Sequence, residues 1–306
     1  MKAIRGLNVR PPYAIVAFVP ASQSVLIFGS AGQLGVELVR VFTELGHEVQ
    51  ALTRTDADLA QPQSIADAIR AVAPAFVVNS AAYNLVDRAE SEPEAAFAIN
   101  ALAVCAMAKA CQEIGARLLH FSTDYVFDGD AGRPYTETDE THPIGAYGVS
   151  KLAGEFYARA YLEDALIVRP CGVFGPAGRH TPGGNFPELM LRFAKEGKPL
   201  RVVNDAIVSP TYAPALAERS AKLLLSDAVG VFHIGGGEAL TWYEYARLIF
   251  QAAGLNPAIE PVDRTTFPTA ARRPLYSALS NARMESAQVP PMPKLTDALA
   301  DLMQRR

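Results

Sequence analysis

A tyrosine and a lysine four residues apart, Tyr147 and Lys151, are the residues of this sequence best spaced for acid–base chemistry. At helical spacing both side chains point from one face of a helix. A free tyrosine has a pKa of about 10 and is a poor acid–base group at neutral pH. A lysine ammonium beside it favours the phenolate and moves that pKa toward the working range. We therefore expect Tyr147 to exchange a proton with a substrate, and Lys151 to tune Tyr147 and to hold cofactor ribose hydroxyls.

A hydroxyl group is expected beside this pair. The fourth predicted strand, residues 117–122, runs directly into Thr123. Side chains at the carboxyl end of a parallel strand face the ligand crevice of an α/β sheet. We therefore expect Thr123 to hydrogen-bond a substrate carbonyl oxygen and to share the proton of Tyr147.

A glycine-rich turn near the start of the chain predicts dinucleotide binding. Gly29, Gly32 and Gly35 have the spacing G-x-x-G-x-x-G and lie between a predicted strand, 25–28, and a predicted helix, 33–45. Such glycines allow a tight turn and a close approach of the backbone to a pyrophosphate, which the amides of the helix N-terminus then face.

The end of the second predicted strand bears on the choice between NADPH and NADH. NAD sites usually have an acidic residue there, which holds the ribose 2′-hydroxyl. Here the strand 49–52 is followed by Arg54, whose guanidinium can pair with a 2′-phosphate, and this favours NADPH. Asp56 and Asp58 come next, and either can instead reach the ribose or the adenine edge.

The composition is that of a globular, cytoplasmic protein. Half of the 306 residues are apolar and 20% are charged. The net charge of −4 argues against a general nucleic-acid binder. The three cysteines lack C-x-x-C spacing and the five histidines are scattered, so no disulfide scaffold and no metal site are expected. No apolar run reaches the ~18 residues of a membrane-spanning helix.

The elements that position these residues alternate regularly. Short apolar runs predict strands at 25–28, 49–52, 76–79, 117–122, 166–169, 200–203 and 230–234. Helical spacing predicts helices at 33–45, 64–72, 92–114, 147–161, 188–195, 213–226, 241–253 and 297–303. The early strands are apolar almost throughout, as is typical of strands covered on both faces. The prediction is an α/β fold, a Rossmann-like doubly wound parallel sheet with a smaller C-terminal substrate-binding region.

The predicted division into domains follows this regularity, which fades after Arg169. Residues 24–170 are expected to form the NAD(P)-binding Rossmann domain. Residues 171–306 are expected to be mainly substrate-binding, with segments near 200–215 and 230–236 returning to the Rossmann domain. Residues 1–23 are expected to be an N-terminal extension; their basic start and short apolar run loosely resemble a signal peptide.

Longer stretches of the chain resemble one family. They read VVNSAAY at 77–83, VDRAESEP at 86–93, STDYVF at 122–127 and, at 147–155, YGVSKLAGE. With the glycine turn they resemble the extended short-chain dehydrogenase/reductase superfamily, and within it the dTDP-4-dehydrorhamnose reductase family. Weaker signatures follow at 185–186, 204–205, 209–211 and 273–274, so that the similarity runs from about residue 24 to the end.

The resemblance implies reduction of the C4 ketone of dTDP-4-dehydro-L-rhamnose, a nucleotide-linked 4-dehydro-6-deoxy sugar, to dTDP-L-rhamnose. It implies NADPH or NADH as cofactor and a homodimer as a possible assembly, with no nucleic-acid or membrane partner. Tyr147 would then protonate the C4 alkoxide, Lys151 would bind the nicotinamide ribose and Thr123 would orient the ketone. Asn100 would support the lysine and a proton-relay water.

The full set of expected site residues combines the motifs above with the resemblance. Those expected to contact the cofactor are Gly29, Ser30, Gly32, Gln33, Leu34, Gly35, Arg54, Asp58, Leu59, Asn79, Ala81, Ala82, Tyr83, Asn100, Tyr147 and Lys151. Those expected on the substrate side are Asp124, Tyr125, Asn185, Phe186, Thr211 and Arg273. The planar guanidinium of Arg273 suits the paired oxygens of a diphosphate.

Two other functions stay open. Rhamnose-type reductases commonly carry a sugar-contacting tryptophan after the fifth strand, where this chain reads PCGVFGP at 170–176. This segment is more similar to that of other superfamily members, which leaves another nucleotide-sugar reductase or a 4-epimerase as the second interpretation. The third is a non-catalytic NADP-binding regulatory subunit of the methionine adenosyltransferase type.

Overall fold

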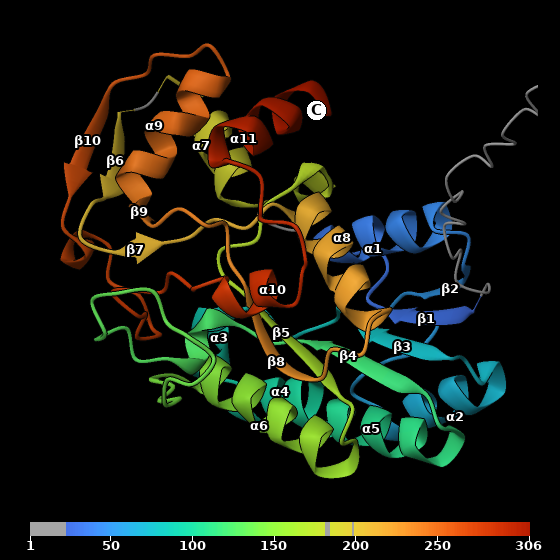
Figure 1. The fold of residues 1–306 in the computed structure, drawn as a ribbon. Helices are drawn as coiled ribbons and strands as arrows, with labels where there is room; N and C mark the ends of the chain where they lie inside the picture. Colours follow the sequence, from blue (N-terminus) through green and yellow to red (C-terminus); the bar gives the residue numbers. More distant parts are fainter. Residues whose placement is uncertain (1–22, 181–183, 198) are drawn as a thin grey trace, which may run out of the picture.

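A six-stranded parallel sheet is the centre of the computed structural model, which describes residues 23–180, 184–197 and 199–306 (Figure 1). The strands lie in the order β2-β1-β3-β4-β5-β8. Their bounds are β1 Ser24–Phe28, β2 Glu48–Leu52, β3 Phe76–Asn79, β4 Arg117–Phe121, β5 Leu166–Pro170 and β8 Gly230–Ile234. The predicted fold class is confirmed, whereas the predicted extension lies outside the described residues except for its last residue.

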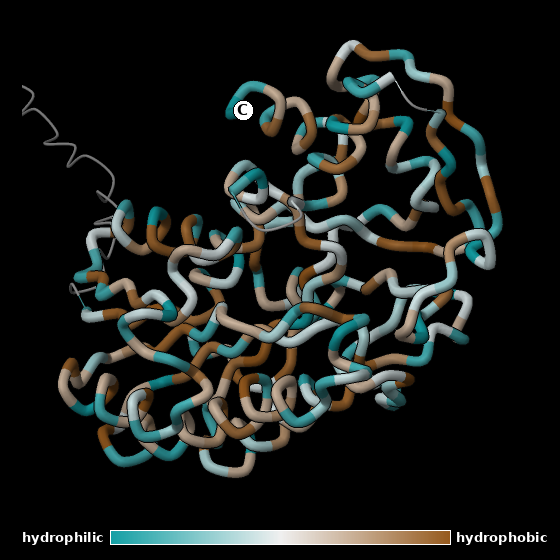
Figure 2. The backbone as a smooth tube through the Cα atoms, turned by 180° about the vertical axis from the view of Figure 1, so that it is seen from behind, coloured by the Kyte–Doolittle hydropathy of each residue, from teal (hydrophilic) through white to brown (hydrophobic). Residues whose placement is uncertain are grey.

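Helices cover both faces of the sheet, which explains the continuous apolar strands. Alternate residues of one strand enter different cores: Val25 and Ile27 pack with α1 (Gln33–Glu44) and α8 (Ala213–Leu224). Leu26 and Phe28 pack on the other face. The helices of that face are α2 (Pro62–Val72), α5 (Ala103–Ile114) and α6 (Ala146–Tyr161). In Figure 2 brown, hydrophobic stretches accordingly run through the middle of the sheet domain.

The predicted helix at 92–114 is one continuous helix with a wider turn in the middle. It consists of α4 (Pro93–Phe97), the π-helical turn η1 (Ala98–Leu102) and α5. By length and composition alone, Pro93–Ile114 could cross a membrane. In this fold α5 instead packs between α2 and α6, and half of the most apolar window is buried. Its hydropathy is therefore that of a core helix.

The smaller region is built around a second core. Two short sheets lie there, β6 (Leu200–Val203) with β10 (Ile259–Val262), and β7 (Ile207–Val208) with β9 (Leu240–Thr241). Helix α9 (Trp242–Ala252) packs against both α7 (Phe186–Lys195) and α11 (Leu295–Gln304).

The two segments expected to return to the Rossmann domain behave differently. Residues 230–234 pair with β5 as the edge strand β8 of the large sheet. Residues 200–203 pair instead with β10, away from that sheet. The burial patterns give the reason, because β6 alternates buried Leu200 and Val202 with exposed Arg201, whereas β8 is buried over four consecutive residues. Helix α8, which follows, does pack on α1.

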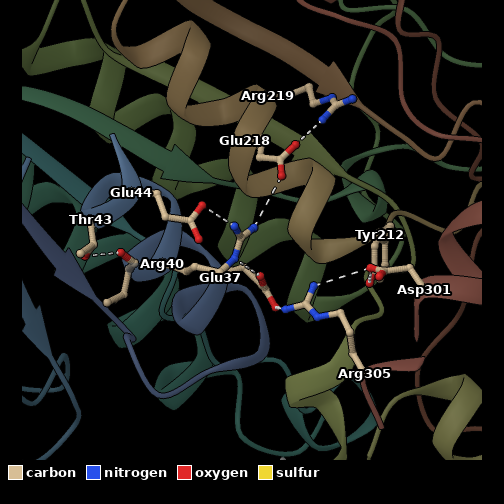
Figure 3. Close-up of polar contacts among 10 residues, drawn as sticks. Glu37, Arg40, Thr43, Glu44, Tyr212, Glu218, Arg219, Asp301 and Arg305 are labelled. Carbon is tan, nitrogen blue, oxygen red and sulfur yellow. Dashed lines mark hydrogen bonds and ion pairs between the residues drawn. The ribbon is translucent and has the colours of Figure 1, made fainter. Parts of the chain in front are cut away.

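An ion-pair cluster ties helix α1 to the C-terminal end of the chain (Figure 3). The Glu37 carboxylate, only 2% exposed, accepts hydrogen bonds from Arg40 and Arg305, each at 2.9 Å. The Tyr212 hydroxyl donates to Asp301 of α11. Helix α1, which begins at the glycine turn, is thus anchored to the last helix of the smaller region.

Within the described part of the chain, five short helices were not predicted. They are α3 (Val86–Ala89), η2 (Asp124–Val126), η3 (Pro176–His180), η4 (Arg264–Thr266) and α10 (Ala282–Ser286). None exceeds five residues, which is too short to give a periodic signal. Two of them, α3 and η2, position residues of the site.

Candidate active site

The glycine turn connects β1 to α1 and leaves no room for side chains. A Cβ on Gly35 would lie 2.0 Å from the carbonyl oxygen of Gly29, and a Cβ on Gly29 would lie 2.7 Å from the Ala81 nitrogen. Gly29 also has φ +78°, a conformation that favours glycine. Gly32 is the N-cap of α1 and brings no capping side chain. The N-terminal amides of α1 are therefore available to an anion such as a pyrophosphate.

The turn lies where the direction of strand succession reverses. β1 has β2 on one side and β3 on the other, so the carboxyl ends of β1 and β3 border a crevice. Asn79 is fully buried at the end of β3; its side chain accepts from the Ala81 amide at 3.1 Å and contacts His120 Nδ1 at 3.1 Å. Asn79 therefore supports the loop that carries Ala81 and Ala82.

The loop after β2 presents an exposed cation. The Arg54 side chain is 83% exposed and forms a long ion pair with Asp58, at 3.9 Å. Asp56 is held by Thr53, whose amide and hydroxyl donate to it at 2.8 and 2.6 Å and lower its pKa. Of the alternatives at this strand end, the loop therefore uses Asp56 internally and leaves Arg54 extended; Leu59 is buried in the core.

The side chains of the other turn residues pack in the core or contact the smaller region. Leu34 lies in the core and the Ser30 amide donates to Leu52. Gln33 donates to the Val173 carbonyl at 3.0 Å and accepts from Asn185 at 2.6 Å. Asn185 also caps α7 through the Glu188 amide. Gln33 and Asn185 thus join the turn to the smaller region.

Tyr147 lies in the first turn of α6, against η2. Its ring meets that of Tyr125 edge to face, with centroids 5.6 Å apart. The Thr123 side chain lies close enough to its phenol to lower the pKa of Tyr147. Thr123 caps η2 by accepting from the Tyr125 amide at 3.2 Å, and it donates to Asp124 at 3.0 Å. The structure therefore brings Thr123 and Tyr147 together.

Lys151 lies one turn further along α6 and is 1% exposed. Its ammonium donates to the Phe121 carbonyl at 2.6 Å, and burial lowers its pKa to about 8. Burial raises the pKa of the Tyr147 phenol above its ordinary value, which the hydrogen bond with Thr123 offsets only in part. The predicted lowering of the tyrosine pKa by the lysine is therefore not found: burial raises this pKa instead.

Asn100 acts as a clamp between loop and helix. It lies in the π-helical turn η1 and is 1% exposed. Its amide pairs with both backbone groups of Tyr83, at 2.9 and 3.0 Å, and donates to Ser150 at 3.0 Å. It thus reaches the neighbour of Lys151, and its contacts fix the loop after β3 against α6.

The residues expected on the substrate side separate into two groups. Tyr125 accepts from Arg273 at 3.3 Å and lies beside Tyr147, and Asp124 is buried behind Thr123 with its pKa raised by burial. Phe186 instead packs between Trp242 and Tyr245 in the core of the smaller region. Thr211 is fully buried and donates to the Cys171 carbonyl at 2.6 Å, so that it supports the loop after β5.

Sequence reasoning missed a buried ion pair below the site. Glu155, one turn after Lys151 on α6, pairs with Arg169 of β5 at 2.8 and 2.6 Å and accepts from Ser122 at 2.5 Å. The spacing of Tyr147, Lys151 and Glu155, four residues each, was the available signal. This pair fixes the helix that carries Tyr147 and Lys151 to strands β4 and β5.

The doubly wound sheet, the glycine turn at its switch point and the grouped Thr123, Tyr147 and Lys151 define an NAD(P)-binding protein of the reductase class. The comparisons with known proteins make this specific. The chain belongs to the RmlD family, whose model, described as RmlD substrate binding domain, matches residues 23–306.

Named relatives agree with this membership. The chain is 41% identical over 276 residues to dTDP-4-dehydrorhamnose reductase of Escherichia coli K12, covering 86% of this chain and 91% of that protein. It is 39% identical over 282 residues to the spore coat polysaccharide biosynthesis protein SpsK of Bacillus subtilis, covering 92% and 97%. A crystal structure of dTDP-4-dehydrorhamnose reductase from Bacillus anthracis in complex with NADP superposes with a TM-score of 0.88 at 31% identity, covering 93% and 100%.

Proposed function

We propose that this protein reduces the C4 ketone of dTDP-4-dehydro-L-rhamnose with NADPH and forms dTDP-L-rhamnose. The observation that carries the proposal is the grouping of Thr123, which caps η2, and Tyr147, whose ring packs edge to face on Tyr125 of η2, with Lys151 one turn further along α6. The identity of 41% to a dTDP-4-dehydrorhamnose reductase supports the substrate.

The residues of the glycine turn fit a dinucleotide. The positions where a Cβ would clash, Gly29 and Gly35, leave the backbone open to a pyrophosphate at the N-terminus of α1. Arg54 is highly exposed and only loosely paired with Asp58, so that its guanidinium can pair with a 2′-phosphate, which supports NADPH over NADH. When bound, the cofactor supplies the hydride.

Tyr147 then acts as the general acid toward the C4 oxygen. Its raised pKa keeps the proton on the phenol until negative charge develops on the substrate. Thr123 holds the phenol and presents a hydroxyl at the same place, where it orients the ketone. Lys151, buried and held by Phe121, carries the positive charge of this pocket toward the cofactor ribose.

Turnover assays with Tyr147→Phe test the proposal. We expect the variant to lose at least a hundredfold in kcat, the scale of general-acid catalysis, with NADPH affinity within twofold of wild type. Product analysis by NMR on dTDP-4-dehydro-L-rhamnose separates the alternatives. Stoichiometric oxidation of NADPH supports a reductase. Recycling of a tightly bound cofactor supports an epimerase. The absence of turnover on any 4-keto sugar supports a regulatory subunit. An active Tyr147→Phe enzyme contradicts the assigned role.

We also propose that the protein works in the cytoplasm as a homodimer. The cysteine usage and the resemblance to the family support these two expectations. Fractionation of cells and sedimentation of the purified protein test them.

A further inference from the structure

A carboxylate directly after helix α3 caps the N-terminus of α6 from outside that helix. The Glu90 carboxylate accepts a hydrogen bond from the amide of Ala146, the first residue of α6, at 2.8 Å. The N-cap of α6, Gly145, brings no side chain of its own to this end. A Cβ on Gly145 would lie 2.8 Å from the Glu90 carboxylate oxygen. The glycine thus makes room for Glu90, which stabilises the turn that contains Tyr147.

One turn earlier, a second carboxylate holds the other side of the site. Asp87 accepts from the Ala271 amide at 3.0 Å and pairs with the Arg273 guanidinium at 2.7 Å. We call residues 271–274 the substrate strap. The strap lies against the site, because Arg273 also donates to Tyr125 and a Cβ on Gly145 would lie 3.6 Å from the Arg272 carbonyl oxygen.

The two carboxylates therefore bind different segments of the chain. Glu90 contacts the helix that carries the proton donor, and Asp87 contacts the strap that carries a cation beside Tyr125. The Glu90–Ala146 contact joins residues 56 apart in the sequence, and the Asp87–Arg273 contact joins residues 186 apart. Both contacts therefore depend on the tertiary fold.

We propose that Asp87 and Glu90 are positioning residues with separate tasks, Glu90 placing Tyr147 for proton transfer and Asp87 placing Arg273 for the diphosphate of the substrate. This inference rests on the proposed function. Two residues that only stabilised the fold would affect kcat and KM together. Asp87 and Glu90, although three apart in the sequence, are expected to affect different kinetic constants.

Steady-state kinetics on paired variants test it. Glu90→Ala removes the cap and lowers kcat about fivefold, the equivalent of a typical N-cap, with the KM for the sugar nucleotide unchanged. Glu90→Gln keeps an acceptor oxygen and restores kcat to within about twofold of wild type. Asp87→Ala raises the KM for the sugar nucleotide about threefold to tenfold and leaves kcat unchanged, and Asp87→Asn, which keeps the bond to Ala271 but not the charge, gives a smaller rise.

The control is Glu94→Gln, which removes one charge from an exposed position of α4. It is expected to match wild type in both constants. The proposal is overturned if Asp87→Ala and Glu90→Ala lower kcat and raise KM in the same proportion, or if either changes nothing.

Amide hydrogen exchange without substrate separates this inference from the proposed function. Glu90→Ala is expected to speed exchange at residues 146–147 and not at the strap, and Asp87→Ala to do the reverse. A wild-type enzyme that is inert on the sugar nucleotide would refute the proposed function. Exchange that rises equally at both places in both variants would refute the separate tasks, whatever the substrate.

Discussion

The buried pair of Glu155 and Arg169 gives the sharpest prediction for stability. Their side chains are 2% and 5% exposed and share two hydrogen bonds at 2.8 and 2.6 Å. Glu155→Gln keeps the volume but removes the charge, so that the Arg169 guanidinium stays buried without its counter-ion. Breaking a buried pair on one side costs about 3–5 kcal/mol. For a chain of this size, that lowers Tm by roughly 5–8 °C.

Urea unfolding followed by circular dichroism measures this free energy, and calorimetry measures Tm. The matched control is Glu163→Gln, an exposed glutamate on the loop after α6, which is expected to change the free energy of unfolding by less than about 0.5 kcal/mol. The double variant Glu155→Met with Arg169→Met is expected to recover much of the loss, because two apolar side chains leave no unpaired charge. A loss below about 1 kcal/mol in Glu155→Gln would refute the reasoning.

Three further predictions concern the cofactor and the pH dependence. Gly35→Ala places a Cβ 2.0 Å from the Gly29 carbonyl oxygen, and calorimetry is expected to show loss of NADPH binding. Arg54→Ala is expected to raise the KM for NADPH about tenfold and leave that for NADH unchanged, the scale of a charge-assisted hydrogen bond; equal effects on both would contradict the 2′-phosphate role. Burial lowers the pKa of Lys151 from 10.5 to about 8, so the unfolded chain binds the extra proton between these values and stability rises there with pH. Urea unfolding of Lys151→Met at pH 7 is expected to give a free energy of unfolding on the order of 3 kcal/mol above that of wild type. This difference is expected to disappear toward pH 10.5.

The sheet domain could be predicted closely because its signals are local. Every strand of the large sheet overlaps a predicted apolar run, and the helices α1, α5 and α6 end within two residues of their predicted ends. The pairing of strand β6 with β10 could not be predicted, because a four-residue run does not indicate its partner. The short helices α3 and η2 escaped prediction because they lack a full helical period.

The site residues also divide into those that a local pattern predicts and those that depend on the fold. The glycine turn and the spacing of Tyr147 and Lys151 could be predicted because each is a local pattern with one chemical use. Phe186 and Thr211 were expected on the substrate side, yet one packs among aromatic rings and the other is fully buried. Residue type alone does not show which way a side chain faces.

By itself, the sequence determined the class of fold, the dinucleotide turn and the acid–base pair, since these depend on residues a few positions apart. Only the tertiary structure decided that Asp87 reaches Arg273, that Glu90 reaches Ala146 and that burial raises the pKa of Tyr147. A carboxylate in a sequence looks the same whether it is solvated or holds a distant segment. Its partner, and the desolvation that sets a pKa, exist only once the chain is packed.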